Sequence, residues 1–257
     1  MDQAEAFRAF AALHVPGDPV ILYNIWDAGS AKVVAEAGAK AIATGSHPVA
    51  DANGFPDGEQ MPLALALANA ERVVGAVELP VTVDFEGAYA VAPEAAAANV
   101  ARLKETGAVG CNFEDQVVGG EGLHPIELQA ARIRAIRSAV GPDFFINART
   151  DLYLKAGLDK HDSALVDQGL ERARAFADAG ASGVFVPLLA DLALLERFCK
   201  ASPLPVNFIA FPGAPSAADA AAAGVARISH GPYPLRLAMK VLKDAAAAAM
   251  DLGQQAS

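Results

Sequence analysis

Cysteine is scarce in this sequence. The 257 residues include two cysteines, Cys111 and Cys199, which lie far apart and lack the short spacing of a metal-binding pair. Two cysteines cannot build a disulfide framework, so we predict that both are reduced and buried. We do not expect either of them to act as a nucleophile.

Positive charge is also in short supply. The sequence has 20 basic residues against 30 acidic ones, a formal net charge of −10, and no run of lysine or arginine. Such a surface repels phosphate backbones and anionic lipids, so we expect neither nucleic acid nor a membrane as a partner. The first ten residues contain no apolar run, which argues against a signal peptide or a membrane span there. We therefore expect a cytoplasmic protein.

The sequence lacks a Gly-x-Gly-x-x-Gly motif after its first apolar segment, which argues against a dinucleotide-binding fold. What it has instead is an eightfold alternation of short apolar runs with longer stretches of helical period. The runs, which read as strands buried on both faces, are Pro19–Ile25, Ala41–Gly45, Pro80–Glu86, Gly110–Asp115, Phe144–Thr150, Gly183–Leu188, Pro205–Phe211 and Ala226–Gly231. This count predicts an α/β fold, a (β/α)8 TIM barrel in which residues 1–257 form one domain. A doubly wound open sheet is the alternative, and it usually has fewer strands.

Carboxylates gather at the ends of the predicted strands. Asp84 and Glu86 alternate along the third strand and so point to one side, Glu114 ends the neighbouring strand about 4.8 Å away, and Asp57 follows the second strand. Strand ends form the active-site face of such barrels. Acids that converge in a low-dielectric mouth repel one another unless a cation lies among them. A hard, oxygen-liganded ion such as Mg²⁺ fits this need; the alternative is that the acids cap helices or pair with Lys and Arg.

Other polar groups stand at the same predicted face. Arg149 ends the fifth strand, where its planar fork suits a bidentate substrate carboxylate, although pairing with a neighbouring acid is the alternative. Gly45 and Ser46 are small enough to let backbone N–H groups approach an anion. Asn207, on the seventh strand, is a candidate donor that could equally satisfy backbone groups.

Several of these segments together resemble the isocitrate lyase/phosphoenolpyruvate mutase superfamily over nearly the whole chain. The matching stretches are Tyr23-Asn-Ile-Trp-Asp-Ala-Gly-Ser-Ala, Thr44-Gly-Ser, Asp57-Gly-Glu, Val83-Asp-Phe-Glu-Gly-Ala-Tyr89, Asn112-Phe-Glu-Asp115 and Asn147-Ala-Arg-Thr-Asp151. The resemblance implies a (β/α)8 barrel, a homo-oligomer (a dimer or a homotetramer) and a C-terminal helix exchanged between subunits.

The resemblance also implies roles for individual residues. Mg²⁺, with Mn²⁺ as the alternative, would be bound mainly by Asp84. The carboxylates of Asp57, Glu86 and Glu114 would then hold the waters of the metal. Gly45, Ser46 and Arg149 match the contacts to the substrate carboxylate and carbonyl, and Asn207 matches the polar residue of strand seven.

The chain departs from the family pattern in one loop. Lyases of the superfamily carry a Lys-Lys-Cys-Gly-His-like loop after strand four, whereas this loop reads Gln116-Val-Val-Gly-Gly-Glu-Gly-Leu-His124. The lysine and asparagine that the mutases carry there are missing too, and strand six ends Val186-Pro187-Leu188 where the lyases have a glutamate. We therefore do not expect isocitrate lyase, methylisocitrate lyase or phosphonate mutase activity proper.

The parts that remain are those that stabilise an enolate. We predict a carbon–carbon lyase that cleaves or decarboxylates a small 2-oxo or 2-hydroxy (di)carboxylic acid resembling oxaloacetate, with Arg149 as a catalytic residue and Tyr89, His124 or water supplying the proton. The alternatives are a phosphonopyruvate-type C–P bond hydrolase or mutase, a non-catalytic 2-oxo-acid-binding protein, and a Schiff-base aldolase, for which Lys155 is the nearest lysine.

Overall fold

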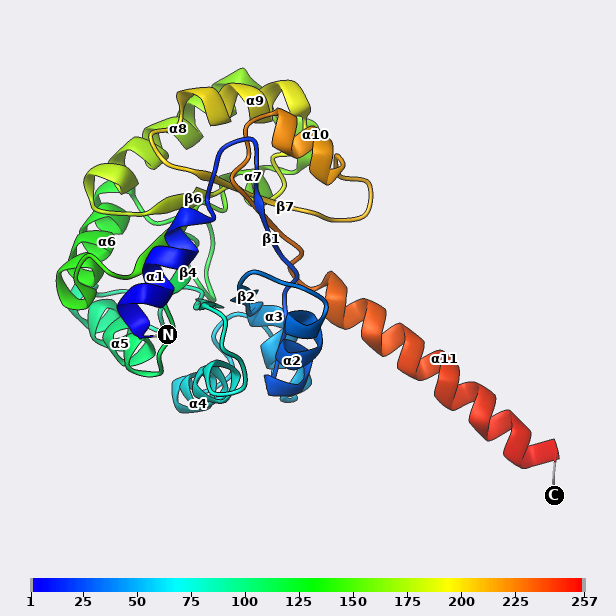
Figure 1. Ribbon diagram of the computed structural model, residues 1–257. Helices are drawn as coiled ribbons and strands as arrows, with labels where there is room; N and C mark the ends of the chain where they lie inside the picture. The colour runs from blue at the N-terminus through cyan, green and yellow to red at the C-terminus, as the bar shows by residue number, and fades with distance from the viewer. Residues whose placement is uncertain (1, 256–257) are drawn as a thin grey trace.

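The computed structural model describes residues 2–255, and in it strands and helices alternate along the chain (Figure 1). The strands are β1 (Val20–Leu22), β2 (Ile42–Ala43), β3 (Val81–Asp84), β4 (Gly110–Glu114), β5 (Phe145–Arg149), β6 (Gly183–Phe185), β7 (Val206–Ile209) and β8 (Arg227–Ser229). The helices are α1 (Gln3–Ala12), α2 (Ala28–Glu36), α3 (Ser46–Ala52), α4 (Leu63–Val74), α5 (Pro93–Glu105), α6 (Ile126–Val140), α7 (Leu152–Ala156), α8 (Ser163–Asp178), α9 (Leu192–Ala201), α10 (Ala217–Ala222) and α11 (Tyr233–Gln255), with a 3-10 turn, η1, at Leu158–Lys160.

The eight strands form one parallel sheet that curls into a nearly closed barrel. The sheet order is β1-β8-β7-β6-β5-β4-β3-β2, so each strand lies beside its neighbour in sequence and β1 lies beside β8. The two ends of the sheet meet at Ile25, whose N–H donates to the Ala43 carbonyl and whose carbonyl accepts from Gly45 N–H. The predicted (β/α)8 barrel is confirmed, and this order excludes the open doubly wound sheet.

The local sequence explains where the helices stop and the strands begin. Gly38, Gly107 and Gly180 each follow the last residues of a helix with φ between 93° and 98°, the left-handed conformation that closes a helix before a strand. The strands that follow are almost wholly buried on both faces. They are shorter than the apolar runs predicted, because the residues at the ends of those runs bend away into the loops that carry the polar groups.

Parallel strands place their carboxyl ends at one face of the barrel. In the sheet register Asp84 lies opposite Asn112, and Glu114 lies opposite Arg149. The side chains that end β3, β4 and β5 therefore share one mouth, as the sequence predicted. None of the helices in residues 2–255 combines the length and the apolar character that a membrane crossing requires.

The other end of the barrel is closed by α1 and the turn after it. The ring of His14 stacks on Phe145 with centroids 4.2 Å apart, and Phe10 packs edge-on against both rings. His14 Nδ1 lies 2.9 Å from the Phe10 carbonyl oxygen, while Nε2 is buried without a partner. Burial, reinforced by the charge of Arg227, lowers the pKa of His14 to about 3.

This depressed pKa predicts an acid-sensitive fold. Below the ordinary histidine pKa of about 6.5, the unfolded chain binds a proton at His14 that the folded chain does not bind. The free energy of unfolding should therefore fall as the pH falls from about 6.5 towards 3, by about 1.4 kcal/mol per pH unit for this one group. His14→Phe should remove that part of the slope. Urea unfolding between pH 8 and 5 measures it, and parallel pH profiles for the two proteins would contradict the assignment.

Candidate active site

A cavity of about 340 Å³ opens at the carboxyl ends of the strands. Its lining comes from the ends of nearly every strand and from the first turn of α11. Asp57, Asp84, Asn112 and Arg149 supply most of its charge and polarity. The cavity is therefore where residues distant in sequence meet, as the barrel architecture requires.

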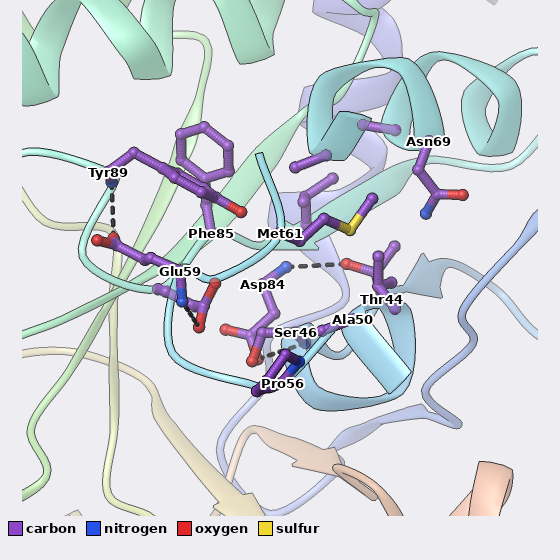
Figure 2. A pocket seen from close by; sticks show the side chains of 15 residues that line it. Thr44, Ser46, Ala50, Pro56, Glu59, Met61, Asn69, Asp84, Phe85 and Tyr89 are labelled. Carbon is purple, nitrogen blue, oxygen red and sulfur yellow. Dashed lines mark hydrogen bonds between the residues drawn. The ribbon is translucent and has the colours of Figure 1, made fainter. Parts of the chain in front are cut away.

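Asp84 lines the cavity from the end of β3, and Figure 2 shows its contacts with Thr44 and Ser46. One carboxylate oxygen accepts the Ser46 N–H at 3.1 Å, and the other accepts from Asn112 Nδ2 at 3.3 Å. Its own backbone N–H donates to the Thr44 hydroxyl at 3.0 Å. These three contacts fix the carboxylate in one orientation while it keeps lone pairs that face the cavity.

A second acid, Glu86, is held close behind Asp84. One Glu86 oxygen accepts the N–H groups of Gly58 and Glu59, both at 2.9 Å. Burial, together with the nearby charges of Asp84, Asp57 and Glu59, raises the pKa of Glu86 to about 7. The site thus accumulates negative charge that its own side chains do not neutralise, which is the condition that favours a bound cation.

The loop after β3 is built from unusual backbone conformations. Glu86, Ala88 and Tyr89 all have φ between 51° and 61°, and so does Glu59 in the loop that faces them. Non-glycine residues rarely adopt this left-handed region, and such residues cluster at functional sites. Glu59 holds the loop by accepting the Tyr89 N–H at 2.7 Å (Figure 2).

A smaller cavity of about 20 Å³ lies on the other side of Asp84 and has room for one water. Glu86, Glu59 and Tyr89 line it, so Asp84 is shared between the two spaces. Burial, and then the surrounding acids, raises the pKa of Tyr89, which therefore keeps its proton.

Arg149 lines the cavity, as predicted, and also forms ion pairs with two acids. Its Nη1 lies 3.0 Å from Glu114 Oε2, and its Nη2 lies 2.7 Å from Asp151 Oδ1. Glu114 is 2% exposed and does not line the large cavity, so the structure places it behind Arg149 rather than beside Asp84. Burial raises the pKa of Glu114 and the Arg149 charge opposes that rise.

Gly45 and Ser46 lie at the mouth as predicted, where β2 gives way to α3. A Cβ on Gly45 would stand 3.0 Å from the Pro48 ring, so no larger residue fits without displacing that ring. The Ser46 N–H donates to Asp84 and the Gly45 N–H donates to the Ile25 carbonyl, so neither backbone N–H is free for an anion, contrary to the sequence prediction. A ligand is therefore met by the Ser46 side chain, and the bare backbone of Gly45 lets it come close.

Five predicted residues do not line the large cavity: Glu114, then Glu86 and Tyr89, which line the smaller one, and finally His124 and Asn207. His124 is 6% exposed, and its backbone is tied to Asp115 and Arg172 at the end of a short hairpin formed by residues 116–123. Asn207 is 1% exposed inside the barrel, where its oxygen accepts from the Ser229 hydroxyl. Neither lines the cavity, and Lys155 does not line it either.

Sequence reasoning missed other members of the site. Glu59 ends the Asp57-Gly-Glu stretch, and the sequence predicts no role for it. In the structure its carboxylate accepts the Tyr89 N–H and so fixes the loop after β3. Arg236 and Tyr233 of α11, and an apolar surface from β6 and β7, also line the cavity. The sequence carries no local signal for Tyr233 and Arg236, because their place in the site depends on where α11 begins.

The acids do not converge tightly enough to form a complete metal cage. Among the described residues, no three His, Cys, Asp or Glu side chains are grouped as direct ligands of one ion. Mg²⁺ usually keeps several of its waters and takes one or two carboxylates from the protein. The arrangement therefore fits one direct ligand, Asp84, with Asp57 and Glu86 within reach of its waters.

Comparison with known proteins gives one family profile and many similar proteins. The profile of the phosphoenolpyruvate phosphomutase family matches residues 10–250. A crystal structure from Burkholderia cenocepacia, provisionally assigned as a phosphonomutase, has a TM-score of 0.93 and 50% identity and covers 98% of this chain and 99% of that one. An uncharacterized Mycobacterium tuberculosis protein is 37% identical over 247 residues, 96% of this chain and 90% of the relative. The 2-methylisocitrate lyase of Escherichia coli is 29% identical over 208 residues, 77% of this chain and 68% of the enzyme.

Proposed function

The chain belongs to the phosphoenolpyruvate phosphomutase family, within the isocitrate lyase/phosphoenolpyruvate mutase superfamily, and from that premise we propose that it is a Mg²⁺-dependent lyase. Its substrate is a small 2-oxo or 2-hydroxy acid of the oxaloacetate type. In a 2-oxo acid the bond that breaks is one held by the carbon next to the carbonyl, because its electron pair then forms an enolate. Cleavage proceeds through an enolate, by decarboxylation or by retro-aldol scission.

One observation carries this proposal: Asp84, Asp57 and Glu86 lie close together, and no lysine or arginine of residues 2–255 forms an ion pair with any of them. Their one basic contact is His47, whose Nδ1 lies 3.7 Å from Asp57. Arg149, the cation in the lining next to them, is already paired with Glu114 and Asp151. A divalent cation would offset the mutual repulsion of the three acids.

The donor set fits Mg²⁺, with Mn²⁺ as the alternative of similar chemistry. Asp84 would hold the ion directly, while Asp57 and Glu86 would accept hydrogen bonds from its waters. When bound, the ion polarises the substrate carbonyl and stabilises the charge that develops on its oxygen.

The chain's own groups bind and orient the acid. Arg149 has five N–H groups and commits three to Asp151 and Glu114, so two remain to donate to a substrate carboxylate. Ser46 and the close backbone at Gly45 meet the other end of that group. His124 and Tyr89 both lie outside the lining of the large cavity, but Tyr89 lines the smaller cavity that shares Asp84 and keeps its proton. Tyr89, by way of that smaller cavity, or water therefore supplies the proton.

The decisive experiment is a turnover assay of the full chain with Mg²⁺. A panel of 2-oxo and 2-hydroxy acids, including oxaloacetate, is followed by ¹H NMR against a matched sample with EDTA. Metal-dependent loss of one acid and appearance of its cleavage product are expected. A folded sample that binds the acids tightly but forms no product would select the non-catalytic binding protein instead.

Carbon–phosphorus chemistry is the second candidate, and the family match and the Burkholderia relative favour it. A phosphonate carries more charge than a carboxylate and needs further donors. Beyond Arg149, the cavity offers His47, beside Asp57, and the exposed Arg236. Including phosphonopyruvate in the panel and recording ³¹P spectra separates the two reactions.

We also propose that the chain forms a homo-oligomer through α11. This helix projects away from the barrel (Figure 1), and it leaves apolar side chains exposed, among them Leu237, Val241 and Leu242 at 57–62%. Unpartnered apolar surface of this kind marks an interface. A second copy of the chain is the occupant that the resemblance implies.

Charged substitutions on α11 test this assembly. Leu237→Asp combined with Val241→Asp should convert the oligomer to monomer, because the pair would bury two carboxylates in an apolar contact. Lys243→Glu, also on the exposed helix, is the control and should leave the oligomer intact. Light scattering after gel filtration reads the mass; a monomeric parent protein would contradict the proposal.

A further inference from the structure

The cavity has two walls of opposite character. Acids, amides and Arg149 line the side formed by β2 to β5. The opposite side is apolar and comes from α7 and the ends of β6 and β7; its members are Leu154, Phe185, Pro187, Leu188, Ile209 and Phe211. We call these six residues the apolar wall. A wall of this size is more than a 2-oxo acid without a side group needs.

Polar atoms next to the apolar wall are already satisfied within the protein. Asn24 Oδ1 accepts the N–H groups of His230 and Gly231 at 2.7 and 2.9 Å, and its Nδ2 donates to the Thr44 carbonyl at 2.8 Å. The Ser229 hydroxyl donates to Asn207 Oδ1. Pro187 and Pro232, which also line the cavity, have no N–H to offer. Asn207 Nδ2 has no partner, but it is buried and does not line the cavity. The side chains of Asn24 and Ser229 therefore have no free donor to offer an anionic group that entered here.

Arg149 borders the wall, with its guanidinium 5.8 Å from the centroid of the Phe185 ring, and there it is placed to anchor the acid end of the substrate. Arg149 is paired with Glu114 and Asp151, and His47 lies beside Asp57. Arg236 is exposed at the rim, with its guanidinium 5.3 Å from the Tyr233 ring. A carboxylate pressed against the apolar wall would lose its hydration without compensation, whereas an alkyl group there would gain by leaving water.

The backbone at the wall is strained in the same way as the acidic loops. Among the described residues, five that are not glycine have positive φ. Four of them, Glu59, Glu86, Ala88 and Tyr89, lie in the two loops that carry the acids Glu59 and Glu86. The fifth is Leu188, at φ 68°, in the apolar wall. Strained backbone persists where surrounding structure enforces it, and it clusters at ligand sites. Leu188 is thus held at the cavity at a cost in backbone energy.

We propose that the substrate carries an apolar substituent on the carbon next to its 2-oxo or 2-hydroxy carbon, and that Leu188, Phe185 and Phe211 receive it. This inference rests on the proposed function, since the acid end must be anchored at Asp84 and Arg149 for the next carbon to face the wall. A second carboxylate, where the substrate has one, is directed away from the wall towards the rim at His47 and Arg236.

Binding of matched ligands tests the proposal by calorimetry on the Mg²⁺-loaded full chain. Oxalate has no side group, and pyruvate, 2-oxobutanoate and 2-oxopentanoate lengthen it by one methylene at a time. Complete burial is worth about 0.8 kcal/mol per methylene, or about fourfold in Kd. From pyruvate to 2-oxopentanoate, which adds two methylenes, Kd should therefore fall by up to about fifteenfold at complete burial and by about tenfold at the partial burial expected here. 2-Oxoglutarate, with a carboxylate in place of the terminal methyl, should bind at least tenfold more weakly than 2-oxopentanoate.

Variants of the wall locate the effect. Leu188→Asn replaces the apolar side chain with one that tolerates positive φ, so the backbone is kept. It should cut the tenfold gain to threefold or less while oxalate binds with Kd within about twofold of the parent. Phe211→Ser, at a half-buried position after β7, should act in the same direction. Leu65→Asn, on the exposed face of α4, is the control and should change nothing.

Each outcome of these titrations either supports or contradicts the apolar substituent. A 2-oxopentanoate that binds no better than pyruvate, a 2-oxoglutarate that binds best, or a gain that survives in both wall variants overturns the apolar substituent while the proposed function stands. Failure of oxalate and of every oxo acid to bind with Mg²⁺ overturns the proposed function, and the inference falls with it.

Discussion

Replacement of Asp84 by alanine is expected to abolish Mg²⁺ binding, with a loss of affinity of at least about a hundredfold. Losing a group that only orients a metal ligand typically costs about 10- to 100-fold, so losing the direct ligand should cost more. Neither Glu86 nor Glu114 can take its place, because Glu86 is fixed by two backbone N–H groups and Glu114 is paired with Arg149. Calorimetric titration of Mg²⁺ into the metal-free protein measures the change.

Two further variants test whether the effect of Asp84→Ala is specific to the direct metal ligand. Glu86→Gln should weaken Mg²⁺ by about tenfold, as expected for a residue that acts through water. Glu71→Ala removes an exposed acid of α4 and controls for the general loss of negative charge. An Asp84→Ala protein whose Mg²⁺ affinity stays within threefold of the parent would show that the metal site, if any, lies elsewhere.

Removal of Arg149 should damage both stability and substrate binding. Arg149→Ala strands Glu114 and Asp151, which are 2% and 0% exposed, without their cation. Breaking a buried pair in this way typically costs about 3–5 kcal/mol in the free energy of unfolding. Arg149→Lys keeps the positive charge but loses the planar fork, so it should fold and still weaken oxalate by tenfold or more.

A matched ion pair elsewhere in the barrel separates the two effects of Arg149. Arg172 lies 3.0 Å from the buried Asp115, but it does not line the cavity. Arg172→Lys should therefore leave the Kd of oxalate unchanged, while Arg149→Lys raises it and changes the Mg²⁺ affinity by less than threefold. Urea unfolding and oxalate titration are run on both. Equal oxalate affinities would make Arg149 a structural residue alone.

The sequence was sufficient for the barrel and for part of the mouth. Eight apolar runs that alternate with eight helical segments are compatible with few other topologies. Parallel strands bring Asp84 and Arg149 to one face of the barrel whatever the loop conformations are. Alternation along β3 also placed Asp84 correctly. Glu86 lies beyond the strand, at φ 51°, so its position depends on loop contacts rather than on alternation.

The remainder of the site depends on tertiary contacts that leave no local signal. His124 stands near the end of a strand in the sequence, but the Gly119 and Gly122 turns fold the loop into a hairpin that buries it. Asn207 lies a layer deeper in the barrel than the cavity floor. Leu188 follows Pro187 without any residue that prefers positive φ, so its conformation is imposed by its surroundings.

The meeting of the two sheet ends at Ile25 has a consequence for the dynamics of the barrel. Along this seam the bridge is made by Ile25, which follows β1, and the Asn24 side chain adds a hydrogen bond to the Thr44 carbonyl. Opening of the seam would be among the least costly local fluctuations of the sheet. A ligand packed between Ser46 and the Asn24 side chain would hold the two sheet ends together by contact, so occupation of the cavity should slow amide exchange along β1 and β2.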